Sequence, residues 1–166
     1  GKRPQDLLAL SAALGPRARL VMLGGLPADA GRKASFMRRA EAAGVGERIV
    51  WTGPLSPEDL SRHLSALDVY VHTHTAGASS RSTTLVSALA HGLPVVAYEG
   101  PETTPAFADG GLTLAPRGDA VALTEHVTAL LDAPGARARA GAEARNLHAR
   151  DFAWDTIARK LEEAVS

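Results

Sequence analysis

The segment from His74 to Thr84 (HTAGASSRSTT) combines small, hydroxyl-bearing and cationic residues in an order that suits the binding of an anion. Gly77 and Ala78 would let a ligand come close to the backbone, and Arg81 carries a planar fork of N–H donors that fits phosphate oxygens. Further donors are the hydroxyl groups of Ser79, Ser80, Ser82, Thr83 and Thr84. A helix is predicted to begin within this segment, so its free N–H groups and dipole would favour the same ligand. The segment is interpreted as a phosphate-binding turn, and the alternative is a surface turn whose serines only cap a helix.

Two other groups of residues, a pair of histidines and a pair of glycines, are of types that occur in metal and nucleotide sites. His72 and His74 lie two apart on a predicted strand and share one face, but a zinc site needs a third ligand that does not occur nearby, so no metal is expected. Gly24 and Gly25 follow an apolar run, and with His74 they are expected to line a pocket. These glycines form neither a GxGxxG motif nor a P-loop, which argues against a dinucleotide enzyme or an NTPase. Trp51 and Trp154 are predicted to be core aromatic residues.

The elements that must position these residues alternate between short apolar runs and helical stretches, as in βα units around a parallel sheet. Strands are predicted over 18–23, 48–52, 68–73, 95–98 and 112–114. Helices are predicted over 4–14, 28–43, 56–67, 80–90, 120–131, 134–150 and 154–165. The runs VYV and PVVAY lack polar alternation, as expected for strands covered on both faces. The sequence therefore predicts one α/β domain with a doubly wound parallel sheet, and we expect a first strand upstream because a helix rarely opens such a domain.

The amino-acid composition argues against several classes of partner and binding site. The 166 residues fit one domain, and 18 basic side chains balance 18 acidic ones. A neutral chain gives no reason to expect nucleic acid as a partner, because affinity for a polyanion depends on an excess of lysine and arginine. There is no cysteine, which is compatible with a cytoplasmic protein and excludes thiolate metal sites. No apolar run is long enough to span a bilayer.

Three pieces of the sequence resemble one known family. LVMLGG, then GERIVWTGPLSPEDLSRHLSALDVYVHTHT, then LVSALAHGLPVVAYEGPE are similar to the C-terminal domain of GT-B glycosyltransferases of family 4, also called glycosyl transferases group 1. SALAHGLPVVA is the most specific piece, and the late DFAWDTIARKLEE resembles the terminal helix of the family. The resemblance covers nearly the whole chain and implies a Rossmann-like fold, the C-terminal half of a GT-B enzyme.

In such enzymes this domain holds a nucleotide diphosphate-sugar, while an N-terminal domain holds the acceptor and the reaction occurs between them. The resemblance implies hexosyl transfer with retention of configuration, without a metal or other cofactor. Residues 1–166 would then be the donor domain alone, inactive without the acceptor domain, through which any peripheral membrane contact would be made. The acceptor would be a glycan, a lipid or a small molecule.

The resemblance and the residues together assign the site. The donor diphosphate is expected to be bound by Lys2, Gly77, Ser80, Arg81, Ser82 and Thr83, and the base by the loop Gly53, Pro54 and Leu55. The family usually carries two glutamates eight positions apart, and the matching residues here are Ser79 and Ser87. Ser87 could bond a ribose hydroxyl but without charge, and Ser79 and Arg81 remain the candidate catalytic residues.

The departure from the family pattern leaves two main hypotheses. The first is a retaining glycosyltransferase that uses the Ser80–Ser82 segment in place of the glutamates. The second is a degenerate domain that binds a nucleotide or a partner without transferring sugar. A flavodoxin-like regulatory domain finds no support, because no acidic phosphoacceptor stands at a strand end.

Overall fold

The computed structural model describes residues 2–24 and 30–165 of the chain. Five short strands occur in the described part: β1 (Leu20–Met22), β2 (Ile49–Trp51), β3 (Tyr70–His72), β4 (Val95–Tyr98) and β5 (Thr113–Ala115). The α-helices are α1 (Pro4–Leu14), α2 (Ala30–Ala42), α3 (Pro57–Ser65), α4 (Thr83–Ala90), α5 (Pro105–Ala108), α6 (Ala120–Asp132), α7 (Pro134–Asp151) and α8 (Trp154–Val165). Each predicted strand and helix is present, with bounds that shift by a few residues.

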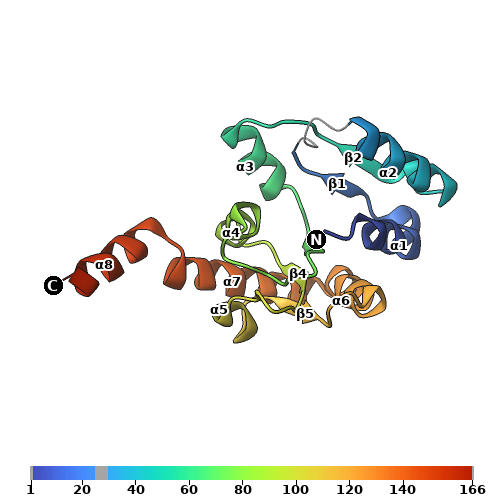
Figure 1. Ribbon diagram of the computed structural model, residues 1–166. Helices are drawn as coiled ribbons and strands as arrows, with labels where there is room; N and C mark the ends of the chain where they lie inside the picture. Colours follow the sequence, from blue (N-terminus) through green and yellow to red (C-terminus); the bar gives the residue numbers. More distant parts are fainter. Residues whose placement is uncertain (1, 25–29, 166) are drawn as a thin grey trace.

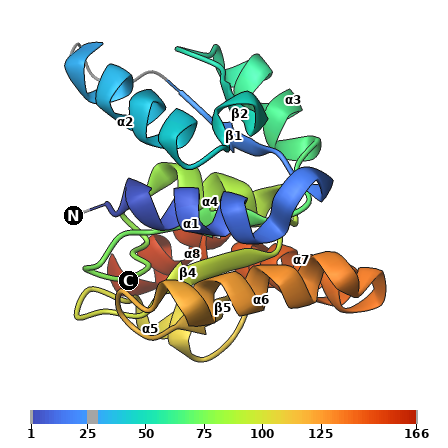
Figure 2. The same ribbon diagram turned by 90° about the vertical axis from the view of Figure 1, so that its right-hand side faces the viewer.

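The strands are parallel, and those described pair in two groups. One sheet has the order β1-β2, with Val21 opposite Val50, and the other has the order β3-β4-β5, with Val71 opposite Val96. Figure 1 shows β1, β2, α2 and α3 above the remaining elements, and Figure 2 shows α1 lying across the molecule between the two groups. The predicted α/β class with a doubly wound parallel arrangement is confirmed, and β1 and β3 are not hydrogen-bonded to each other.

Strand β4 lies at the centre of the larger sheet and is buried on both faces. Val95 and Ala97 belong to a hydrophobic cluster with residues of α4 and α7, whereas Val96 and Tyr98 belong to a second cluster with residues of α1 and α6. Because side chains alternate across a strand, these two clusters are the two faces of one sheet. A sheet covered by helices on both faces explains why PVVAY is continuously apolar.

Helix α3 begins where its sequence predicts. Ser56 is the N-cap, and its Oγ accepts a hydrogen bond from the backbone N–H of Asp59 at 3.1 Å, with Pro57 in the first turn. Helix α4 begins later than the predicted residue 80. Ser82 is its N-cap and accepts from the N–H of Leu85 at 3.4 Å, so Ser80 and Arg81 lie in the preceding loop and not in the helix.

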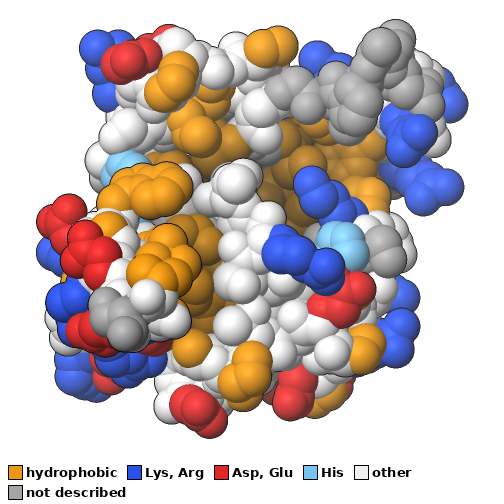
Figure 3. Space-filling model, turned by 60° about the vertical axis from the view of Figure 1, so that its left-hand side comes forward, with side chains coloured by type: hydrophobic (Ala, Val, Ile, Leu, Met, Phe, Trp, Pro, Cys, Tyr) orange, Lys and Arg blue, Asp and Glu red, His pale blue; other side chains and the backbone are white. Residues whose placement is uncertain are grey.

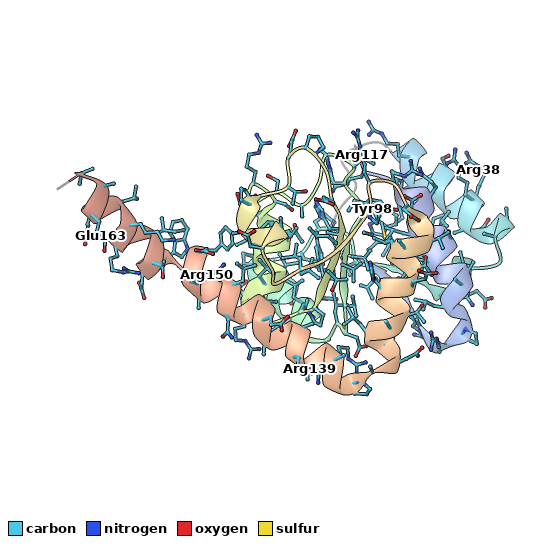
Figure 4. All side chains as sticks on the ribbon, turned by 90° about the horizontal axis from the view of Figure 1, so that it is seen from below. Arg38, Tyr98, Arg117, Arg139, Arg150 and Glu163 are labelled. Carbon is cyan, nitrogen blue, oxygen red and sulfur yellow. The ribbon has the colours of Figure 1, made fainter. Side chains whose placement is uncertain are left out.

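The terminal helix α8 projects away from the rest of the domain (Figures 1 and 4). Trp154, at its start, is 84% exposed, so the prediction of a core residue is wrong there. The prediction fails because a tryptophan on an amphipathic helix is buried only if another element covers that face, and Leu161 and Val165 are exposed as well. Trp51 is partly buried against Phe36, with ring centroids 5.9 Å apart. Within the described residues no helix is long and apolar enough to cross a membrane.

Candidate functional site

The loops that follow the strands meet at one edge of the sheets, the carboxyl edge, where open parallel sheets bind ligands. Gly24 follows β1 and forms an isolated antiparallel bridge with Gly53, which follows β2. His74 follows β3 and forms the same kind of bridge with Lys2, which precedes α1. The structure thus brings the predicted base-binding loop next to Gly24, and Lys2 next to His74.

The contact between Gly24 and Gly53 depends on the backbone conformation of these glycines and on hydrogen bonds from neighbouring side chains. Gly24 and Gly53 have φ values of 89° and 72°, a region that favours glycine. The N–H of Gly24 donates to Thr52 Oγ1 at 3.1 Å, and Trp51 Nε1 donates to the carbonyl of Gly24 at 2.9 Å. Pro54 is exposed and Leu55 half-buried beside this contact. Gly25, predicted to line the pocket, lies outside the described residues.

A cavity of about 450 Å³ opens between β1 and β3 and takes in only part of the predicted site. Lys2, His72, His74 and Thr84 line it, together with many apolar side chains. The lining does not include five residues of the predicted site: Ser79, Ser80, Arg81, Ser82 and Thr83. The side chains predicted to bind the diphosphate therefore lie mostly outside the lining of this cavity, in the loop after His74.

That loop is clasped by the loop after β4, and we call segments 76–80 and 99–104 together the loop clasp. The N–H of Glu102 donates to the carbonyl of Ala76 at 2.7 Å, and the N–H of Thr104 donates to that of Ala78 at 2.9 Å. Ser80 N–H donates to Thr104 Oγ1 at 2.9 Å. The clasp fixes the backbone on which the predicted phosphate-binding side chains stand.

The clasp depends on two glycines at its closest point. Gly77 has a φ of 107°, and a Cβ atom there would lie 2.3 Å from Thr103 Oγ1 and 2.9 Å from the nitrogen of Gly100. A Cβ atom at Gly100 would lie 2.5 Å from the carbonyl carbon of Ala76. Real Cβ atoms essentially never come so close to other atoms, so Gly77 permits contact with the neighbouring loop. The close approach of a ligand at Gly77 stays a prediction from the sequence.

The clasp also carries a carboxylate that the sequence analysis did not assign to the site. Arg81 Nη2 donates to Glu102 Oε2 at 2.5 Å, and Arg81 Nε donates to Ser79 Oγ at 3.5 Å. Glu102 therefore stands beside Arg81, which also contacts Ser79, although 21 positions separate Glu102 from Arg81. The one sequence signal was its place after a strand, in the GPE run that ends the matching segment LVSALAHGLPVVAYEGPE. Ser87 is half-buried on α4, one to two turns further along.

The sequence also did not predict a buried polar cluster of Arg3, Asp6 and Tyr98, close in the chain to Lys2. Asp6 is only 4% exposed. Its carboxylate accepts from Arg3 Nε at 2.6 Å and from the Tyr98 hydroxyl at 2.7 Å. Burial, and then the hydrogen bond to Asp6, raise the pKa of Tyr98. Since the N–H of Arg3 also donates to the carbonyl of Thr73 at 3.0 Å, this cluster fixes the approach of the chain that carries Lys2.

His72 lies nearly buried between two other rings. The ring of Tyr70 stacks 6.3 Å from it on one side, and the ring of His74 stacks 6.1 Å from it on the other. Burial, together with the positive charges of His74 and Lys2, lowers the pKa of His72 to about 4. His72 is thus a neutral residue of the strand, whereas His74 stands at the strand end.

The lowered pKa of His72 predicts a loss of stability in mild acid. The unfolded chain takes up a proton at this residue near pH 6.5, whereas the folded chain does not until about pH 4. The free energy of unfolding should therefore fall as the pH drops from 6.5 towards 4, by up to roughly 3 kcal/mol from this residue. Urea unfolding across this range measures the effect. His72→Asn should flatten the dependence, and an unchanged pH profile in that variant would contradict the assignment.

Comparison with known proteins agrees with this geometry. Residues 2–147 match the model of a family described as glycosyl transferases group 1. No protein of curated function matches the chain in sequence. Among solved structures, Alr3699/HepE from Anabaena in complex with UDP and glucose superimposes with a TM-score of 0.82 at 20% identity, over 99% of this chain and 44% of that one.

Two further structures are similar. The C-terminal domain of LpcC, a glycosyl transferase group 1 family protein from Francisella tularensis, has a TM-score of 0.76 at 16% identity, covering 90% of this chain and 79% of that one. An O-GlcNAc transferase from Thermobaculum terrenum has a TM-score of 0.73 at 25% identity, covering 98% of this chain and 32% of that one. The chain spans less than half of the length of the Anabaena protein.

Proposed function

Because the chain belongs to the glycosyl transferases group 1 family, we propose that it is the donor-binding domain of a retaining glycosyltransferase. It binds a nucleotide diphosphate-sugar, whose sugar passes to a glycan, lipid or small-molecule acceptor held by an N-terminal domain. The observation that carries the proposal is the loop clasp, which presents Arg81 and a row of hydroxyl groups at the carboxyl edge of a parallel sheet. The structurally similar Anabaena protein has been crystallised with UDP and with UDP-glucose, which supports a nucleotide sugar as the ligand.

The charges at this edge suit a diphosphate. Arg81 is exposed, and its ion pair with the exposed Glu102 is of a kind worth at most about 1 kcal/mol. A diphosphate, which carries more charge and offers paired oxygens, would compete well for the guanidinium. When the bond from sugar to phosphate breaks, negative charge builds on the leaving group, and in this proposal Arg81 and Lys2 are the cations that stabilise it.

Glu102 supplies, in this proposal, the carboxylate that Ser79 lacks. Its backbone is fixed by the bond from its N–H to Ala76, and its side chain reaches the guanidinium that also contacts Ser79. Once Arg81 turns to the diphosphate, the Glu102 carboxylate is freed as a charged acceptor for a sugar hydroxyl. The roles of Arg81 and Glu102 are linked, because Arg81 releases the Glu102 carboxylate when it binds the diphosphate.

Calorimetry of residues 1–166 with UDP and with GDP tests the proposal. Arg81→Ala should weaken binding of the nucleotide diphosphate at least about tenfold, because a hydrogen bond to a charged group contributes roughly 1.5–3 kcal/mol. Glu102→Gln should leave UDP binding nearly unchanged and weaken binding of the UDP-sugar. Arg159→Ala is the matched control, because Arg159 is also exposed and also pairs with an exposed glutamate, Glu163 on α8.

The outcomes separate the assignments. If neither UDP nor GDP binds at millimolar concentration, the donor-domain proposal is wrong. If Arg81→Ala and Arg159→Ala bind equally well, the nucleotide binds elsewhere on the domain.

A second candidate is a degenerate domain that binds without catalysis. It is favoured by serine at both positions where the family usually has glutamate, Ser79 and Ser87. Turnover of a sugar donor by the full-length protein would exclude this candidate, and the anomeric configuration of the product, measured by NMR, would test retention.

A further inference from the structure

Ser61 of α3 and His91, the C-cap residue of α4, form a hydrogen-bonded pair that the proposed function does not use. Ser61 Oγ lies 2.8 Å from His91 Nε2, and 30 positions separate the two residues. Ser61 is exposed and His91 is half-buried. In Figure 3, histidine side chains reach the surface where the upper group of elements, which includes α3, meets the lower group, which includes α4. The pair therefore joins two packed helices at a position that solvent can reach.

The second ring nitrogen of His91 fixes the tautomer of the ring. His91 Nδ1 lies 2.7 Å from the carbonyl oxygen of Ser87, one turn earlier in α4. Because a carbonyl oxygen can only accept a hydrogen bond, Nδ1 carries the proton of the neutral ring and donates it. Nε2 is then the nitrogen with the free lone pair, and the Ser61 hydroxyl donates to it. His91 is thus oriented as a base towards Ser61.

This arrangement has the parts of an activated serine. Such a nucleophile needs a base within about 2.6–3.2 Å and a third group that orients the base. In serine hydrolases the third group is a carboxylate, which holds the imidazole in the correct tautomer, and here the carbonyl of Ser87 does so. Ser65, one turn further along α3, donates instead to the carbonyl of Ser61 at 3.0 Å. Ser61 is therefore the serine of α3 that has a base beside it.

We propose that Ser61 is an acylation site, to which activated esters and thioesters transfer their acyl group. Ser61 Oγ forms a bond to the acyl carbon while its proton passes to His91 Nε2. The bond from the acyl carbon to the leaving oxygen or sulfur then breaks, and the leaving group takes the proton from Nε2. The products are an ester on Ser61 and a free alcohol or thiol, and His91 is neutral again.

The place of Ser61 in its helix restricts the class of acyl donor. Free N–H groups occur only in the first turn of a helix, and Ser61 lies beyond them, since the N–H of Leu60 already donates to the carbonyl of Ser56 at 2.9 Å. The helix therefore offers Ser61 no N–H group to stabilise an oxyanion, and the gain in rate comes from the base, which contributes about 10²–10⁴-fold. The acyl donor must bring a good leaving group, such as a phenol or a thiol, and amides are not substrates.

The acylation site is separate from the candidate nucleotide site. Ser82 caps the N-terminal end of α4, next to the loop clasp, whereas His91 caps the C-terminal end. Arg145 of α7 holds that end, because its Nη2 donates to the carbonyl of His91 at 3.3 Å. Acylation of Ser61 therefore does not require a bound nucleotide.

Treatment of residues 1–166 with p-nitrophenyl acetate, and separately with an acetyl thioester, tests the proposal. Peptide mass spectrometry should find that Ser61 is acetylated at least about tenfold faster than Ser65. Ser65 is the matched comparison, because it is also exposed on α3 but its hydroxyl donates to a carbonyl and not to an imidazole. The comparison is made within one chain and does not depend on a variant that folds. Equal rates at the two serines would overturn the proposal.

Two variants show whether His91 is the base. His91→Gln should lower the rate at Ser61 to that at Ser65, whereas His126→Gln, which replaces a half-buried histidine of α6, should leave the rate at Ser61 unchanged. The Tm of each variant is measured, and acetylation is compared below both Tm values. A rate at Ser61 that survives His91→Gln, or an acetyl group found on His91 with Ser61 unmodified, would equally contradict the assignment.

Discussion

Gly77→Ala should destabilise the domain by about 3 kcal/mol or more and abolish binding of the nucleotide diphosphate. Two costs add at this position. A φ of 107° strains any residue with a Cβ atom, which costs about 1–2 kcal/mol. The new methyl group would also lie 2.3 Å from Thr103 Oγ1 and 2.9 Å from the nitrogen of Gly100, and overpacking of this kind typically costs a further 1–3 kcal/mol.

The neighbouring loop cannot simply move away, because it is bonded to this one. Glu102 N–H donates to Ala76 and Thr104 N–H donates to Ala78, so relief of the overlap breaks the clasp. Arg81 would then lose its fixed position opposite Glu102. For this reason the variant should lose affinity for UDP beyond what its lower stability explains.

Gly44→Ala is the matched control for Gly77→Ala. Gly44 also has a positive φ, 66°, but a Cβ atom there would have no neighbour within 4 Å. It should therefore show the conformational cost alone, about 1–2 kcal/mol, with nucleotide binding intact. Urea unfolding measures the stabilities and calorimetry the binding. If the two variants lose the same stability, the close approach of the two loops does not constrain the domain.

Asp6→Ala should lower the free energy of unfolding by about 3 kcal/mol, although Asp6 lies outside the predicted site. The change leaves the hydroxyl of Tyr98, which is fully buried, without its acceptor. It also removes the counter-charge of Arg3, a smaller contribution because the side chain of Arg3 is 39% exposed and therefore partly screened by solvent.

Two milder variants separate the contribution of the charge from that of the hydrogen bond. Asp6→Asn keeps an acceptor for the Tyr98 hydroxyl and removes the charge, and it should cost less than Asp6→Ala. Tyr98→Phe removes one donor and should cost about 1 kcal/mol. In a double-mutant cycle, Asp6→Ala and Tyr98→Phe should be clearly less than additive, because they remove the same hydrogen bond. Full additivity in urea unfolding would mean that the bond between Asp6 and Tyr98 contributes nothing.

Much of the secondary structure could be predicted because the signals are local. Ser56-Pro57-Glu58 begins α3 as predicted, since an N-cap and a first-turn proline act within one helical turn. The prediction failed by three residues at α4, where Ser80 and Ser82 are equally good caps in sequence. The neighbouring loop binds the backbone N–H of Ser80 through Thr104, which holds this residue in the loop, and the helix begins after Ser82. Trp154 failed for a similar reason, since burial depends on what another element covers.

The sequence by itself determined the order of strands and helices, the α/β class and the family, because periodicity, caps and the SALAHGLPVVA run can be read without knowing distant contacts. Only the tertiary structure decided which side chains meet. Asp6 and Tyr98 are 92 positions apart, and Arg81 and Glu102 are 21 apart. No local pattern encodes such pairs, because they arise only where the carboxyl ends of parallel strands come together. The loop from His74 to Thr84 carries the cation and hydroxyl groups, and the fold brings to it the carboxylate that its own sequence lacks.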